Sequence, residues 1–290
     1  MNRNRIVTLA VLSVGLLLCA TPARAGNMDG VISSEYPNKI LTLRHFYSGD
    51  RLHLYADGTL VDDAPAGTWT SDGQVEVRDA SLNGSVLSIK GRRIYQVYDA
   101  KSKQFVDALS LLPTYPEKQQ KDLERMLRRR QVEIQIEMPP TPDPREIPET
   151  LHAVFLAPYE PVSAVVPVYY HDFFANGESA SHSVNGVAGV VRVVSPGDKP
   201  GQVSPPHAAS TPAPEYSEAG RQLKYQGTVV ISLVVDPSGA VRNPQIAVPL
   251  GLGLDDKAIA AVSQWKFDPA QKDGKPVAAA IGVQVEFKLK

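Results

Sequence analysis

The chain has 290 residues, of which 43% are hydrophobic, a length and composition that suit two folded units rather than one. Its 30 Lys and Arg nearly balance 31 Asp and Glu, for a net charge of -1. This balance excludes the strongly basic surface of a typical nucleic-acid-binding protein, and we expect no nucleic-acid partner.

The first 25 residues have the pattern of a secretory signal peptide. A positively charged start precedes an apolar run over residues 6–20, and Ala23-Arg24-Ala25 has small residues where a signal peptidase cuts. The apolar run is shorter than the roughly 20 residues that a membrane-spanning helix needs. We therefore predict cleavage after residue 25 and a periplasmic protein. An uncleaved segment would instead anchor the chain in the inner membrane, facing the periplasm.

The reactive side chains indicate no catalytic or metal centre. Cys19, the only cysteine, lies in the predicted signal peptide, so the mature chain has no thiol chemistry. The six histidines show no metal-ligand spacing, and no Gly-x-Ser-x-Gly or phosphate-binding loop occurs. We expect no metal, no cofactor and no enzyme activity.

Residues 38–105 predict a series of short strands. Apolar and polar residues alternate over 41–45 and 51–55, as in strands with one buried face. Hairpin turn signals recur along this stretch, at Asp57-Gly58, Asp72-Gly73 and Asn83-Gly84. Regular spacing of this kind predicts an antiparallel meander or a small barrel.

A helix is expected from Pro116 to about Arg130, followed by a strand over 132–137 and a short helix from Pro148 to Leu156. We therefore predict a mainly antiparallel β N-terminal domain, residues 26–185, with one or two helices. Residues 186–213 are rich in Pro, Gly and Ser and predict a linker. The C-terminal domain then covers 214–290.

This C-terminal domain predicts an α+β fold in two layers. A short helix over 218–224 precedes strands over 228–235 and 241–248, which a Pro-Ser-Gly turn connects. The strongest helix pattern, Leu254 to Trp265, has one apolar stripe, with Asp255 and Asp256 in its first turn, where the helix dipole favours carboxylates. Apolar residues then alternate without a break over 277–289. Together these patterns predict a three-stranded antiparallel sheet with helices against it.

Several short motifs in this domain occur in a characteristic order. They are Gly227-Thr228-Val229, Asp236-Pro237-Ser238-Gly239, Trp265-Lys266-Phe267-Asp268-Pro269-Ala270 and Gly274-Lys275-Pro276-Val277. Their order and spacing resemble the C-terminal domain of TonB-family proteins, over about residues 205–290. The resemblance implies a periplasmic module that docks on outer-membrane receptors in TonB-dependent transport. It captures a short box peptide of the receptor as an added strand.

The last strand is the matching element, because a chain-terminal strand is often a sheet edge whose backbone groups accept an extended peptide. The predicted partner-binding residues are Tyr216, Ile281, Gly282, Val283, Gln284, Val285, Glu286 and Phe287. In the family an aromatic-proline pair opens the domain, whereas Ser217 follows Tyr216 here. The alternative is that this strand only completes the sheet, since charged side chains on an edge deter pairing.

Two other functions stay open. A membrane-anchored energy transducer would couple an uncleaved N-terminal helix to the inner-membrane motor complex. In the family that helix carries a histidine, and residues 1–25 have none. A periplasmic ligand-binding or scaffold protein would instead use the N-terminal β domain. We favour a periplasmic TonB-family protein whose C-terminal domain binds a peptide segment of an outer-membrane receptor.

Overall fold

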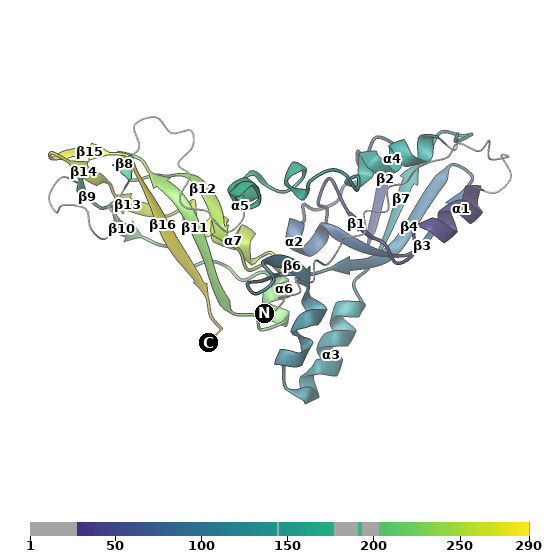
Figure 1. Cartoon of the computed structure of the whole chain (residues 1–290), viewed down its shortest axis with the longest axis horizontal. Helices are drawn as coiled ribbons and strands as arrows, with labels where there is room; N and C mark the ends of the chain where they lie inside the picture. Colours follow the sequence, from purple (N-terminus) through teal and green to yellow (C-terminus); the bar gives the residue numbers. More distant parts are fainter. Residues whose placement is uncertain (1–27, 144, 177–190, 193–202, 290) are drawn as a thin grey trace, which may run out of the picture.

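The computed structural model describes residues 28–143, 145–176, 191–192 and 203–289. The predicted signal peptide and most of the predicted linker lie outside these residues. Two lobes, each built on a β sheet, meet in the middle of the molecule (Figure 1). We call residues 28–176 the N-terminal lobe and the described residues from 191 onward the C-terminal lobe. The mixture of sheets and helices confirms the α+β class.

The N-terminal lobe begins with α1 (Met28–Glu35), β1 (Ile40–Thr42), β2 (Arg51–Tyr55), α2 (Trp69–Asp72), β3 (Gln74–Asn83), β4 (Val86–Ile94), β5 (Gln96–Asp99) and β6 (Gln104–Asp107). It continues with η1 (Ala108–Thr114), α3 (Glu117–Arg128), β7 (Gln131–Glu137), α4 (Glu146–Val154), η2 (Val162–Ala164), η3 (Val168–Tyr170) and α5 (His171–Asn176). The two predicted longer helices correspond to α3 and α4, and the predicted strand over 132–137 corresponds to β7.

The main sheet of this lobe has the order β1-β3-β4-β7-β2. Neighbouring strands are antiparallel except β2 and β7, which run parallel. The predicted meander or barrel is therefore wrong: the sheet is open, and β2 pairs with a strand far along the chain. The Asn83-Gly84 turn joins β3 to β4 as predicted, with Gly84 at φ +62°. The Asp72-Gly73 turn is instead the end of α2.

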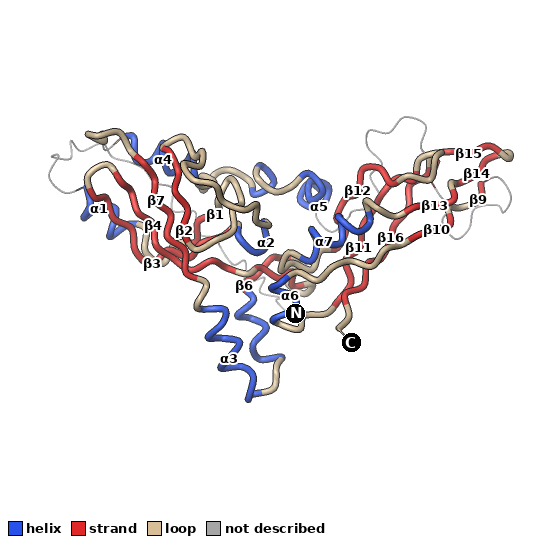
Figure 2. The backbone as a smooth tube through the Cα atoms, turned by 180° about the vertical axis from the view of Figure 1, so that it is seen from behind, coloured by secondary structure: helices blue, strands red, loops and turns tan. Residues whose placement is uncertain are grey.

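One face of this sheet forms an apolar core with α4. Val77, Ile89 and Ile134 are completely buried, as expected for strands that alternate between a covered and an exposed face. Ile147 and Leu151 of α4 pack on them. Figure 2 shows α4 running across this sheet.

We predict that Ile134→Ala lowers the free energy of unfolding by about 2–5 kcal/mol, because it leaves a cavity in a closed core. Ile40→Ala in the same sheet is the control. Its side chain is 57% exposed, so we expect a change within about 0.5 kcal/mol. Urea unfolding of both variants measures the difference, and equal losses would contradict this description of the core.

The C-terminal lobe contains β8 (Val191–Arg192), β9 (Val203–Ser204), β10 (His207–Ser210), α6 (Glu218–Gln222), β11 (Gly227–Val235) and β12 (Val241–Val248). After these come α7 (Leu254–Val262), β13 (Lys266–Asp268), β14 (Ala270–Lys272), β15 (Lys275–Val277) and β16 (Ala279–Phe287). Its main sheet has the order β12-β11-β16-β8. The three long strands are antiparallel, as predicted, and the two-residue β8 adds a parallel fourth strand.

Two details of this lobe differ from the sequence-based expectation. Helix α7 ends at Val262, so Trp265 lies beyond it and is only partly buried; its indole N–H donates to the Pro212 carbonyl at 3.0 Å. Strands β9 and β10, which fall within the predicted linker, pair with β14 and β13. These last residues before the module are therefore attached to it by backbone pairing.

The lobes share one hydrophobic core along their junction, which we call the seam. Trp69, Val97 and Tyr170 from the N-terminal lobe belong to the same buried cluster as Leu252 and Leu254 from the C-terminal lobe. Aromatic rings fill the N-terminal side, with Trp69 packed edge-on against Phe105, Tyr170 and Phe174. The seam therefore has the packing of a protein interior.

Candidate functional site

The candidate site is the outer edge of β16. On its inner side β16 pairs with β11 along its whole length, from Phe287 opposite Gly227 to Ala279 opposite Val235. On its outer side, β8 pairs with Ala279 and Ala280, and it is the only described strand there. In the described part of the chain, residues 281–287 therefore have no neighbouring strand on the outer side and form an edge of the sheet.

Side chains along this edge alternate as the sequence predicts. Gly282, Gln284 and Glu286 are exposed, whereas Val285 and Phe287 are buried. Ile281 and Val283 also face the core, yet both are only half buried. On the neighbouring strand β11, Ile231 and Leu233 are 0% and 2% exposed. The apolar layer is therefore complete at β11 and incomplete at β16.

Tyr216 supports one end of this edge. Its ring packs edge-on against Phe287, with 5.4 Å between ring centroids, and its hydroxyl donates to the Tyr225 carbonyl at 3.2 Å. Ser217, which stands where the family has proline, is the N-cap of α6, and its hydroxyl accepts from the Gly220 N–H at 3.0 Å. The structure thus brings Tyr216 and β16 together.

The opposite edge of the sheet, β12, is poorly suited to strand addition. Pro244 has no N–H to donate, and the register with β11 shifts next to it, where Asn243 has φ +46°. In addition, η3 and α5 of the N-terminal lobe lie against β12 (Figure 1). The two edges of the sheet therefore differ in accessibility.

The seam also contains polar contacts that no sequence pattern predicts. Asp255 is completely buried, and its carboxylate accepts the N–H groups of Leu250 and Gly251 at 2.8 Å and the Tyr170 hydroxyl at 2.7 Å. The Tyr169 hydroxyl donates to Asp256 at 2.5 Å. The sequence shows two adjacent tyrosines and two adjacent aspartates, but they lie more than eighty residues apart and no pattern indicates that they contact each other.

Burial raises the pKa of Asp255 to about 7, against the opposing effect of its hydrogen-bond donors. Burial also raises the pKa of Asp256, whose second oxygen has no hydrogen-bond partner among the described residues. The pKa values of the Tyr169 and Tyr170 hydroxyls are raised by burial and by these carboxylates, so both hydroxyls remain protonated donors.

We predict that Asp255 makes the fold less stable as pH rises. In the unfolded chain an aspartate loses its proton near pH 4, whereas the folded chain keeps it to about pH 7. The stabilisation is complete below pH 4, and it falls by up to about 1.4 kcal/mol per pH unit until pH 7. Urea unfolding between pH 4.5 and 8 should show this slope reduced in Asp255→Asn. An identical slope in both proteins would contradict it.

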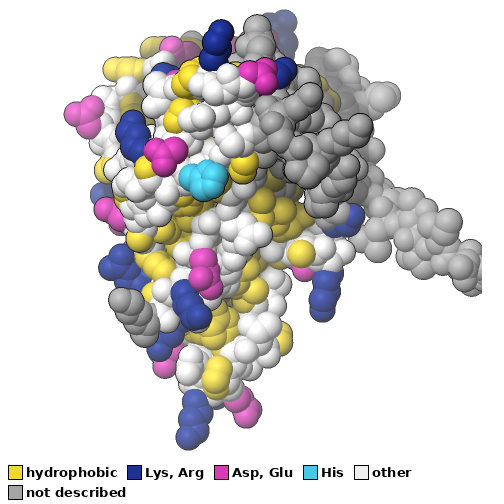
Figure 3. Space-filling model, turned by 90° about the vertical axis from the view of Figure 1, so that its left-hand side faces the viewer, with side chains coloured by type: hydrophobic (Ala, Val, Ile, Leu, Met, Phe, Trp, Pro, Cys, Tyr) yellow, Lys and Arg dark blue, Asp and Glu magenta, His cyan; other side chains and the backbone are white. Residues whose placement is uncertain are grey.

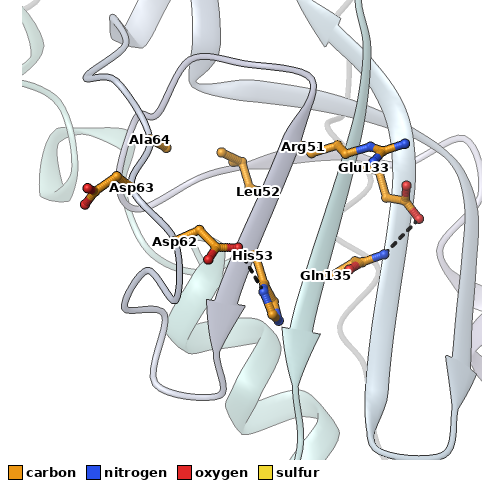
Figure 4. Close-up of a pocket in the computed structure, with 8 residues that line it drawn as sticks. All are labelled: Arg51, Leu52, His53, Asp62, Asp63, Ala64, Glu133 and Gln135. Atoms are coloured by element: carbon orange, nitrogen blue, oxygen red, sulfur yellow. Dashed lines mark hydrogen bonds and ion pairs between the residues drawn. The ribbon is translucent and has the colours of Figure 1, made fainter.

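Apart from the β16 edge, a polar pocket lies on the N-terminal lobe. It has a volume of about 240 Å³ and is lined by Arg51, Leu52, His53, Asp62, Asp63, Ala64, Glu133 and Gln135. Figure 4 shows that these side chains come from β2, β7 and the loop after β2. The His53 ring lies 3.3 Å from Asp62 and 3.0 Å from Glu137, so carboxylates contact both of its nitrogens.

Neither a metal site nor a membrane span is found in the described residues. Their His, Cys, Asp and Glu side chains form no group of three or more that could hold a metal ion. Over the same residues, none of the helices is both long and apolar enough to cross a bilayer.

Comparison with known proteins finds similarity within the C-terminal lobe. Residues 212–289 match the family model described as "Gram-negative bacterial TonB protein C-terminal". The chain is 36% identical over 93 residues to "Protein TonB" of Vibrio cholerae, covering 32% of this chain and 36% of that protein. It is 34% identical over 79 residues to "Protein tonB2" of Pseudomonas aeruginosa, covering 27% and 29%. The chain thus spans about a third of the length of these curated relatives.

Among solved structures, the chain is similar to the one titled "Solution NMR structure of Pseudomonas aeruginosa TonB CTD". That match has a TM-score of 0.24 and 17% identity, and it covers 30% of this chain and 91% of that one. The assignment depends on the sequence matches, which coincide with the β11, β12, α7 and β16 elements. Residues 212–289 are therefore similar in sequence to the C-terminal domain of TonB proteins.

Proposed function

We propose that this protein works in TonB-dependent transport at the cell envelope, where its C-terminal lobe binds an extended segment of an outer-membrane receptor. The segment adds as a strand to the outer edge of β16, over residues 281–287. The observation that carries this proposal is that Ile281 and Val283 are only partly buried, beside almost fully buried neighbours on β11. Alternate apolar side chains of an added strand would cover them.

The surroundings of the edge support this assignment. Pro244 and the N-terminal lobe obstruct β12, so an incoming strand meets its open backbone groups at β16. Figure 3 shows the end of the C-terminal lobe, where hydrophobic side chains lie among charged ones. Gln284 and Glu286 point away from the core, where they would select among partners.

Binding should depend on which face of the edge is changed. We expect Val283→Lys to weaken binding of a receptor box peptide roughly tenfold or more, because a charge directed at the core face opposes strand addition. Gln284→Lys, one residue along on the exposed face, is the control, with an expected change of less than about threefold. Isothermal titration of the purified chain with the synthetic peptide measures both.

The same experiment has a structural measurement. Peptide at saturation should slow hydrogen exchange of the outward-facing amides among residues 281–287, which do not bond to β11, and leave those of β12 unchanged. Unchanged exchange along β16, or equal losses of affinity in the two lysine variants, would overturn the proposal.

We also propose that the protein is periplasmic, on the basis of the signal-peptide pattern in residues 1–25. Mass spectrometry of the protein isolated from its natural envelope should give an N-terminus at Gly26. An intact Met1 in the inner-membrane fraction would instead favour the anchored energy transducer.

A further inference from the structure

The backbones of the two lobes pair with each other at the seam. Val97 of β5 forms an antiparallel bridge with Gly251, in the segment between β12 and α7. The Leu252 N–H donates to the Gln96 carbonyl at 2.8 Å, and the Tyr98 N–H donates to the Leu250 carbonyl at 3.0 Å. Backbone hydrogen bonds therefore link β5 of the N-terminal lobe to the segment before α7, at a position away from β16.

The start of α7 is also held by the N-terminal lobe. Gly253 is its N-cap residue and has no capping side chain, and its N–H donates to the Thr70 hydroxyl at 2.8 Å. Tyr170 and Tyr169 donate to Asp255 and Asp256 in the first turn of α7. Without the N-terminal lobe, these groups would lose partners that are buried along with them.

The seam leaves no space at its centre. Gly251 has φ +91°, and a Cβ placed on it would lie 2.3 Å from the Gln96 carbonyl oxygen. A third contact lies at α6, where the Tyr115 hydroxyl donates to the Leu223 carbonyl at 2.6 Å. Backbone pairing, hydrogen bonds and a common apolar core thus coincide over the same surface.

We propose that the N-terminal lobe is a built-in protein partner of the TonB-like module. It clamps α7 and the segment before it, covers the β12 side, and leaves β16 as the edge for other partners. The two lobes then behave as a single rigid unit rather than as domains that move freely on a linker. The clamp does not depend on what binds at β16.

Cutting the chain between the lobes tests this. A protease site inserted within residues 177–190 allows cleavage of the otherwise complete, folded chain. We expect the two fragments to stay together on size-exclusion chromatography at micromolar concentration, because the seam holds them without a covalent link. Separation of the cleaved wild-type fragments would overturn the proposal.

Two glycines give a matched pair of variants. Gly251→Ala introduces both positive-φ strain and the clash with Gln96, and we expect at least tenfold weaker association of the cleaved fragments. Gly274→Ala has similar strain, at φ +73°, but no atom lies within 4 Å of its Cβ. We expect it to associate like the wild type. Equal association of the two variants would contradict a clamp at Gly251.

A second pair avoids backbone strain if Gly251→Ala fails to fold. The double variant Tyr169→Phe and Tyr170→Phe removes both hydroxyl donors, and we expect association weakened by about tenfold. Tyr159→Phe is the control, since Tyr159 is 81% exposed. If the cleaved fragments of the double variant associate as tightly as those of the wild type, these hydroxyls do not hold the lobes together. If the wild-type protein does not bind the box peptide but its cleaved fragments stay associated, the proposed function is refuted and the clamp is not.

Discussion

The position of the two lobes depends on one buried carboxyl group. Asp255 has no exposed surface, and a buried polar group must have its hydrogen bonds satisfied within the protein. Two of its three donors belong to its own lobe, and the third, Tyr170, belongs to the other. A shift of one lobe along the other would leave this carboxyl buried without its third donor. The apolar cluster around it provides attraction between the lobes, whereas Asp255 fixes their register.

The C-terminal lobe could be predicted from the sequence because its signals are local. Alternation over 277–289, the Asp236 turn and the apolar stripe of α7 each depend on residues close together in the chain, and β12 has the predicted bounds. For the N-terminal sheet, the sequence predicts where strands lie but not the order in which they pair. The parallel pairing of β2 with β7 joins segments about eighty residues apart, and alternation shows which face is buried but not which strand lies beside it.

The candidate site was predictable to a similar extent. A chain-terminal strand suggested an edge, and the sheet order agrees for residues 281–287. Alternation alone would predict full burial for Ile281 and Val283, because it cannot show that the layer above them is incomplete. The family resemblance predicts Tyr216 as a partner-binding residue, and in the structure its ring packs against Phe287. The sequence places Asp255 in the first turn of a helix, where the dipole favours a carboxylate, and no local pattern indicates its contact with the other lobe.

The sheet itself connects the clamp to the candidate binding edge. Strand β11 pairs with β12 on one side and with β16 on the other, and Ile231 and Leu233 on it are almost fully buried. A strand added to β16 would therefore lie three strands from β12, within the same hydrogen-bonded sheet. Because backbone hydrogen bonds link neighbouring strands directly, a displacement of β16 would have to break its bonds to β11 or move β11, β12 and the N-terminal lobe with it. A TonB-like module on a long flexible spacer has no such constraint. In this protein, the partner at β16 would bind to the whole folded unit.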